Sequence, residues 1–205
     1  MEYLKDYGLS PQEQEIVIKA SQKFHDMVKQ YDKDPYSLTG HLQQLEKWWQ
    51  YVIREYPELN PFVVFTSIWL HDAWYYPIGE EDHAITGERI TRAFLSKEWV
   101  ASEIIDQIAH AVRSHRNKDV SPATLEAKMI ACIDSVSHFT DPLLYMSIIT
   151  MPYPHKTPAE SYKFLEWKME RDYRDAQFFP AIHKQIEPIY TAWKEIINQI
   201  RDFNF

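Results

Sequence analysis

Glycine, cysteine and long apolar runs are all scarce in this sequence of 205 residues. The 4 glycines argue against phosphate-binding glycine loops and against a hairpin-rich β fold. The single cysteine, Cys132, excludes an internal disulfide, and its apolar neighbours predict a buried free thiol. No segment approaches the roughly 18 apolar residues that a membrane span needs, and the N-terminal residues do not resemble a targeting signal. We therefore expect a cytoplasmic protein that has no membrane partner.

The charged side chains are mainly acidic. Lys and Arg number 22 against 30 Asp and Glu, which gives a formal net charge of −8. An acidic chain is poorly suited to neutralising a phosphate backbone, so nucleic acid is not an expected partner. The hydrophobic fraction of 45% and the charged fraction of 25% are typical of an ordinary globular domain and exclude disorder. We expect one domain over residues 1–205.

Apolar residues recur at spacings of three and four along much of the chain, which predicts helices. Ser10 and Pro11 are typical of an N-cap and a first helical residue, and Ser121 followed by Pro122 marks another start in the same way. The predicted fold class is all-α, with about seven to nine helices. After the first helix, the expected segments are Leu38 to Glu55, Pro61 to His71, Asp82 to Leu95, Ala101 to His115, Ser121 to Phe139, Pro158 to Asp175 and Pro180 to Phe205.

The segment Phe62–Leu70 is almost wholly apolar, which predicts a central helix buried on all sides. It is followed by His71 and Asp72, and such a pair is costly to bury unless each polar group has a partner. A metal ion beyond the helix end would satisfy both side chains, and nitrogen with oxygen ligands suits Mn, Fe, Ni, Co or Zn. The alternative is a His-Asp pair that only caps the helix.

A second carboxylate, Asp134, lies within an apolar helical run, where it would need a cation. With His41 upstream, the polar residues of the apolar helices follow the order H…HD…D. This order resembles that of the HD-domain superfamily of metal-dependent phosphohydrolases, over a metal-site core of about residues 34–139. The segment Lys168–Tyr173 is similar to the C-terminal helices of bacterial members, so we expect such helices over residues 140–205.

The resemblance implies a ligand set. His41, His71, Asp72 and Asp134 match the ligands of the first metal. His83 and His115 lie in segments similar to those whose histidines bind a second metal in binuclear members. One or two divalent ions are implied, among Mn, Fe, Ni, Co, Zn and Mg, with Asp72 as the bridge and with Asp72 and Asp134 as the catalytic residues.

The other histidines fit this pattern less well. His110 precedes His115 by five residues, about 140° around a helix, so both cannot comfortably face one site. We favour His115 as the ligand and expect His110 to lie in the core or behind the ligands. The four remaining histidines, His138 among them, match nothing in the family pattern and are expected to be surface or internally satisfied residues.

Several residues near the expected ligands would suit a phosphorylated substrate. Tyr75 and Tyr76 follow the His-Asp pair and could stack on a planar group, although aromatic residues more often pack in the core. Arg113, Arg116 and Lys118 flank His115, where cations suit a phosphate; a solvated helix face is the alternative.

The expected function is hydrolysis of a phosphate ester, such as that of a nucleotide, by in-line attack of a metal-activated water. The partner would be a small phosphorylated substrate. Some family members carry a glutamate shortly after the His-Asp pair to assist the water, and this chain has Ala73–Tyr76 there, so another base or the metal alone must serve. Two alternatives stand beside this function: a di-iron oxygenase with the same ligand pattern, and a non-catalytic module that binds a metal or nucleotide for regulation.

Overall fold

The computed structural model describes residues 1–30, 34, 37–75, 81–141, 145 and 157–202. Helices dominate these residues and no strand occurs among them, which confirms the all-α prediction. Two short 3-10 helices, η1 and η2, accompany the α helices; the sequence pattern did not predict η1. The elements are η1 (Glu2–Tyr7), α1 (Pro11–Gln30), α2 (Leu38–Val52), η2 (Ile53–Glu55), α3 (Pro61–Leu70), α4 (His83–Lys97), α5 (Ser102–Ser114), α6 (Leu125–Thr140), α8 (Pro158–Ala176) and α9 (Pro180–Asp202).

Helix α3 forms the centre of the structure, as its composition predicts. Every residue from Phe62 to Leu70 is buried, and the helix packs against α1, α2, α5 and α6. Its start is fixed by Asn60, whose side-chain oxygen accepts hydrogen bonds from the backbone N–H groups of Phe62 and Val63 at 3.0 and 3.3 Å. Burial on all sides leaves the two polar residues that follow α3 inside the core.

Helix α6 begins four residues later than the sequence predicts. The hydroxyl of Thr124 accepts a hydrogen bond from the N–H of Ala127 at 3.1 Å and acts as the N-cap. Ser121 and Pro122 therefore do not begin the helix. The N–H of Ala123, which an N-cap at Ser121 would bind, donates instead to Nε2 of His110 at 2.9 Å. Further along α6, the buried thiol of Cys132 confirms the prediction for this residue.

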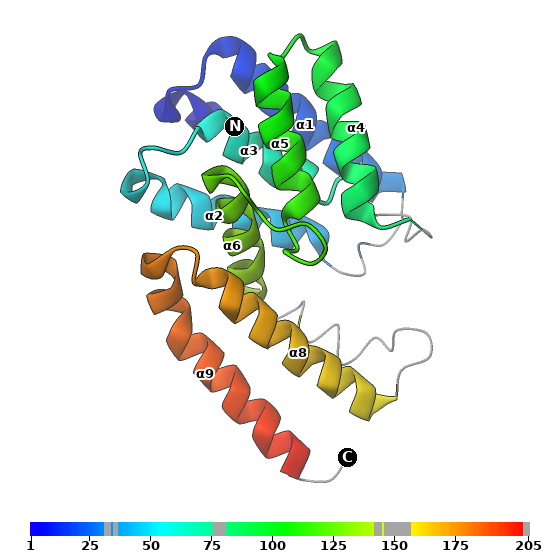
Figure 1. Cartoon of the computed structure of the whole chain (residues 1–205), viewed down its shortest axis with the longest axis vertical. Coiled ribbons are helices and arrows are strands. Elements are labelled where there is room, and N and C mark those ends of the chain that lie inside the picture. Colours follow the sequence, from blue (N-terminus) through cyan, green and yellow to red (C-terminus); the bar gives the residue numbers. More distant parts are fainter. Residues whose placement is uncertain (31–33, 35–36, 76–80, 142–144, 146–156, 203–205) are drawn as a thin grey trace.

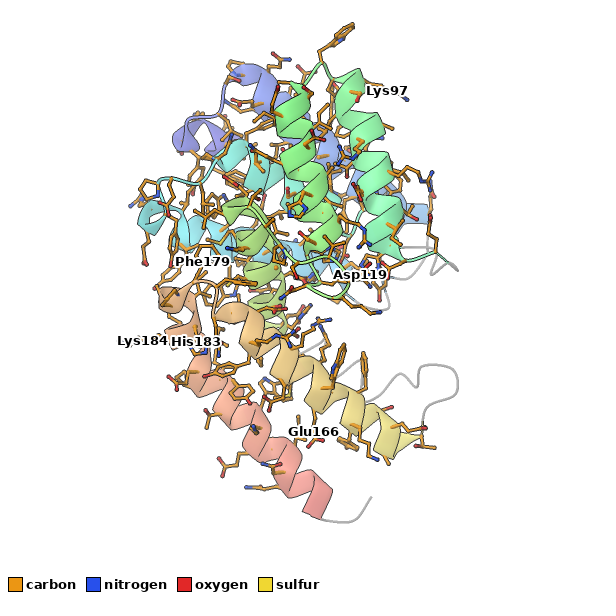
Figure 2. The ribbon with its side chains drawn as sticks, in the orientation of Figure 1. Lys97, Asp119, Glu166, Phe179, His183 and Lys184 are labelled. Atoms are coloured by element: carbon orange, nitrogen blue, oxygen red, sulfur yellow. The ribbon has the colours of Figure 1, made fainter. Side chains whose placement is uncertain are left out.

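Helices α8 and α9 lie side by side and extend away from the other helices (Figure 1). Both pack against α6, which connects them to the body of the protein. Phe179, labelled in Figure 2, lies in the turn between them and packs its ring edge-on against Tyr56, with 4.8 Å between the ring centroids. Prolines at positions 152, 154 and 158 predict a stiff turn between helices over Met151–Pro158, and most of this segment lies outside the described residues. Among the helices of the described residues, none combines the length and the apolarity that crossing a membrane requires.

Candidate metal centre

Five helices bring the six predicted ligands together. His41 comes from α2, His71 and Asp72 follow the end of α3, and His83 is the first residue of α4. His115 directly follows α5, and Asp134 lies in the middle of α6. All of them are buried except His83, whose side chain is 18% exposed. Residues separated by up to 93 positions in the chain (134 − 41) thus share one interior site.

The first group of ligand atoms surrounds one carboxylate oxygen of Asp72. Its Oδ2 lies 3.5 Å from Nε2 of His71 and 3.7 Å from Nε2 of His41. The two imidazole nitrogens are 3.4 Å apart. Oδ1 of Asp134 lies 3.0 Å from the same nitrogen of His41 and 3.7 Å from that of His71. His41 and His71 thus each direct Nε2 at an oxygen of Asp72 and at an oxygen of Asp134.

The second group surrounds the other oxygen of Asp72. Its Oδ1 lies 3.3 Å from Nε2 of His83 and 3.8 Å from Nε2 of His115. These two nitrogens are separated by 3.3 Å. Each oxygen of Asp72 therefore faces its own pair of histidines.

These separations fit metal coordination. Two ligand atoms that each lie about 2.1 Å from one ion are roughly 3.0 to 4.2 Å apart, for angles between 90° and 180° at the ion. The N–N and N–O distances given above, from 3.0 to 3.8 Å, all fall within this range. Two triads can each hold an ion. The first, His41, His71 and Asp72, is buried, and the second, Asp72, His83 and His115, is buried except for His83.

The orientation of three imidazole rings is fixed from behind. Nδ1 of His71 donates to the carbonyl of Ile68 at 2.8 Å, and Nδ1 of His115 donates to that of Val112 at 2.6 Å. Nδ1 of His41 lies 2.9 Å from the hydroxyl of Ser137, which itself donates to the carbonyl of Asp134 at 2.6 Å and so accepts from the imidazole. When each imidazole is neutral, a proton on Nδ1 leaves the lone pair on Nε2, the atom that faces the site.

The electrostatics favour bound positive charge. Burial alone would raise the pKa of Asp72, but His71, His83 and His115 outweigh it and lower this pKa to about 2. Burial would likewise lower the pKa of His71, but the carboxylates of Asp72 and Asp134 outweigh it and raise this pKa to about 9. Burial lowers the pKa of His115 to about 3, so this imidazole is in the neutral form that binds metals. Burial would raise the pKa of Asp134 too, but His138, His41 and His71 hold this pKa well below its usual value. Two ionised carboxylates are thus buried among nitrogen ligands, where uncompensated charge would be costly.

His115, and not His110, faces the site. His110 is half-buried, and its Nε2 accepts the backbone hydrogen bond from Ala123 in the loop between α5 and α6. The two histidines contact different neighbours, as their separation of about 140° around the helix predicts.

The predicted substrate residues divide into two groups. The ring of Tyr75 lies against that of His83, with 4.9 Å between centroids, and Arg116 pairs with Asp82, the N-cap of α4 directly before His83. Both therefore lie beside the second ligand group. Arg113 instead forms a double hydrogen bond with Asp119, labelled in Figure 2, and Lys118 is exposed. Tyr76 lies outside the described residues.

One histidine beside the ligands has no counterpart in the predicted ligand set. His138 is buried, and its imidazole stacks on that of His41 with 5.0 Å between centroids and 7° between planes. The sequence analysis expects His138 to have hydrogen-bond partners inside the protein. This expectation holds for Nδ1, which lies 2.8 Å from Oδ2 of Asp172. The signal that could have found it is its position four residues after Asp134, which places the two side chains on the same face of α6.

Comparison with known families agrees with this site. Residues 40–138 match the family model of the HD domain. This match identifies residues 40–138 as an HD domain and supports membership in the HD-domain superfamily. The matched segment of this HD domain begins beside His41, ends at His138 and includes every ligand described above. No curated protein and no solved structure matches the chain significantly. The HD-domain superfamily consists mostly of metal-dependent hydrolases, and the buried His and Asp side chains of this member fit metal binding.

Proposed function

We propose that this HD-domain protein is a metal-dependent phosphohydrolase that cleaves a phosphate ester of a small molecule, with nucleotides as the first substrate class to test. The observation that carries the proposal is the position of Asp72, each of whose oxygens faces a different pair of histidines. Such a carboxylate suits two ions held side by side. When bound, two divalent ions lower the pKa of a water molecule and stabilise negative charge on the phosphoryl and leaving oxygens.

The two carboxylates have separate roles in this proposal. Asp72 would hold both ions, because each of its oxygens faces a different pair of histidines and its own position is set by the end of the buried helix α3. The contacts of Asp134 with His41, His71 and His138 are all made by Oδ1. We assign Oδ2 of Asp134 to orienting the attacking water for an in-line approach to phosphorus.

Arg116 and Tyr75 are the residues that we assign to substrate binding. The Nε atom of Arg116 is buried without a hydrogen-bond partner among the described residues, and the guanidinium lies close to Asp82, next to His83. The guanidinium is planar and charged and its side chain is 19% exposed, which suits contact with a phosphoryl oxygen. Tyr75 lies against His83 and offers a ring on which a base could stack.

The test is a turnover screen on metal-stripped protein reloaded with Mn²⁺, Fe²⁺, Co²⁺ or Zn²⁺. We expect release of inorganic phosphate from at least one class among nucleotides, sugar phosphates and simple phosphomonoesters, and no release from the stripped protein. The absence of phosphate release across the whole panel in every metal would contradict the proposal.

The same screen separates the two alternatives. A di-iron oxygenase would consume oxygen in the iron-loaded state and would release no phosphate. A regulatory module would bind a nucleotide tightly, measured by calorimetry, and leave it intact. The donor set alone accommodates all three functions, because mixed nitrogen and oxygen ligation does not select one metal.

A further inference from the structure

A buried group of polar side chains lies behind His138, on the side of the site covered by α8. Asp172 is fully buried in α8, and its Oδ2 lies 2.8 Å from Nδ1 of His138. The same carboxylate accepts hydrogen bonds from the hydroxyl of Tyr145 at 3.2 Å and from the guanidinium of Arg171 at 2.8 Å, and it pairs with Lys168 at 3.1 Å. Asp172 lies outside the segment that the HD-domain model matches.

This arrangement fixes the imidazole of His138. Nδ1 of His138 has two neighbours, Oδ2 of Asp172 at 2.8 Å and Nζ of Lys168 at 3.0 Å. The closer one is a carboxylate, which only accepts hydrogen bonds, and Lys168 can donate to that same oxygen at 3.1 Å. We therefore place the proton of the neutral imidazole on Nδ1. The lone pair is then on Nε2, which lies 3.7 Å from Oδ1 of Asp134. This distance is longer than a hydrogen bond and falls within the range for two ligands of one ion. Ring stacking on His41 holds the imidazole in place from one side.

His138 therefore has the features of a ligand. The ligand atoms of His41, Asp134 and His138 all lie within 4.8 Å of one another, and all three side chains are buried. The imidazoles of His71 and His115 are prepared in the same way, by an acceptor behind Nδ1. At His138 that acceptor is a carboxylate, which makes the imidazole a stronger electron donor than a backbone carbonyl does.

We propose that Nε2 of His138 binds the first metal ion together with His41 and Asp134, and that Asp172 is the residue that positions it. This inference rests on the metal centre described above and not on the reaction that it catalyses. A further imidazole would add a nitrogen ligand to the first position. Because Mg²⁺ prefers oxygen ligands, this addition favours Mn²⁺, Fe²⁺, Co²⁺, Ni²⁺ or Zn²⁺. It also gives helix α8 a role in the site, through Asp172.

The experiment uses Co²⁺ as the probe, because its visible absorption reports the ligands around it. The full-length protein is stripped of metal and titrated with Co²⁺, and binding is followed by equilibrium dialysis and by the absorption spectrum. We expect His138→Gln and Asp172→Asn each to weaken one of two Co²⁺ ions by about 10-fold to 100-fold and to change its spectrum. The other ion keeps the wild-type affinity and spectrum.

The matched control is Asp175→Asn. Asp175 is as buried as Asp172 and lies on the same helix, but its carboxylate accepts a hydrogen bond from Asn117 at 2.9 Å and not from His138. We expect this variant to bind both ions as the wild type does. If His138→Gln does not fold, His138→Phe keeps a ring of similar size for stacking and removes the ligand atom.

Each outcome bears on a different claim. Wild-type affinity and spectrum for both ions in the folded His138 variants would overturn the proposal. A change in the His138 variants with none in Asp172→Asn would overturn the positioning role. If the wild-type protein bound no Co²⁺, the metal centre itself would fail, and this inference with it.

Discussion

The two ion positions share Asp72 but have different surroundings. His41, His71 and Asp134 of the first are almost completely buried and come from the tightly packed helices α2, α3 and α6. The second has His83 at the start of α4, with 18% of its side chain exposed, and is bordered by Tyr75 and Arg116. A buried position with many protein ligands retains an ion, whereas a more open one leaves coordination positions for water and substrate. We therefore expect the first position to bind more tightly and the second to meet the substrate.

The largest effect is expected from Asp72→Asn, because this change removes the one ligand that both positions share. The amide keeps the shape of the side chain but loses the charge that two ions require. We expect both ions and all turnover to be lost, as measured by elemental analysis and phosphate release.

Asp119→Asn is the matched control for that change. Asp119 is exposed and pairs with Arg113, and its replacement should leave the metal content unchanged. Full metal content and activity in Asp72→Asn would contradict the shared role of this carboxylate.

Two double variants address the difference between the positions directly. His83→Ala with His115→Ala should reduce the metal content from two equivalents to one, because the ligands of the first position remain. His41→Ala with His71→Ala should remove the tighter ion. The ion that remains in this variant should be lost to a chelator more readily than the ion that remains in the His83→Ala, His115→Ala variant. Elemental analysis and competition with a chelator of known affinity provide the measurement.

His183→Ala serves as the control for removal of a histidine, since His183 lies at the start of α9 (Figure 2). Equal metal retention in the two double variants would show that burial does not distinguish the positions. Loss of both ions from each would mean that the two ions bind only as a pair.

A smaller effect is expected from Arg116→Gln, at the edge of the second position. Loss of a charged hydrogen bond to a phosphoryl oxygen should raise KM about tenfold while kcat changes less. Metal content has to be measured alongside, because Arg116 also pairs with Asp82 before His83.

Arg113→Gln is the comparison, because Arg113 is already engaged by Asp119. Its KM should stay close to that of the wild type. A larger KM change for Arg113 than for Arg116 would reverse the assignment of the phosphate contact.

The smallest effect is expected from Thr124→Ala, at the start of the helix that carries Asp134. Removal of the N-cap hydroxyl should lower the free energy of unfolding by about 1 kcal/mol, as measured by urea denaturation of the metal-free protein. Thr124→Ser keeps the cap and should be close to the wild type. Because the first position is buried among packed helices, both variants should keep their metal; loss of the tighter ion from Thr124→Ala would show that this position depends on the helix end.

Part of the site follows from local pattern. A His-Asp pair at the end of a wholly apolar helix, and a carboxylate within another apolar helix, are costly to bury alone, and this cost is enough to single out His71, Asp72 and Asp134 from the sequence. The helices themselves follow from apolar periodicity and caps. The start of α6 does not, because Ser121–Pro122 has the chemistry of a cap, while the N–H of Ala123 is bound by His110, thirteen residues earlier.

The sequence by itself determined which side chains are too costly to bury without a cation, because burial cost depends on the residue and its near neighbours. Only the tertiary structure decided which oxygen of Asp72 faces which histidines. It also decided that Arg116 lies beside the site while Arg113 pairs with Asp119. The contact of Asp172 with His138 depends on tertiary structure in the same way. These relations join residues from different helices, and their distances depend on how the helices pack. Local spacing carries no information about such distances.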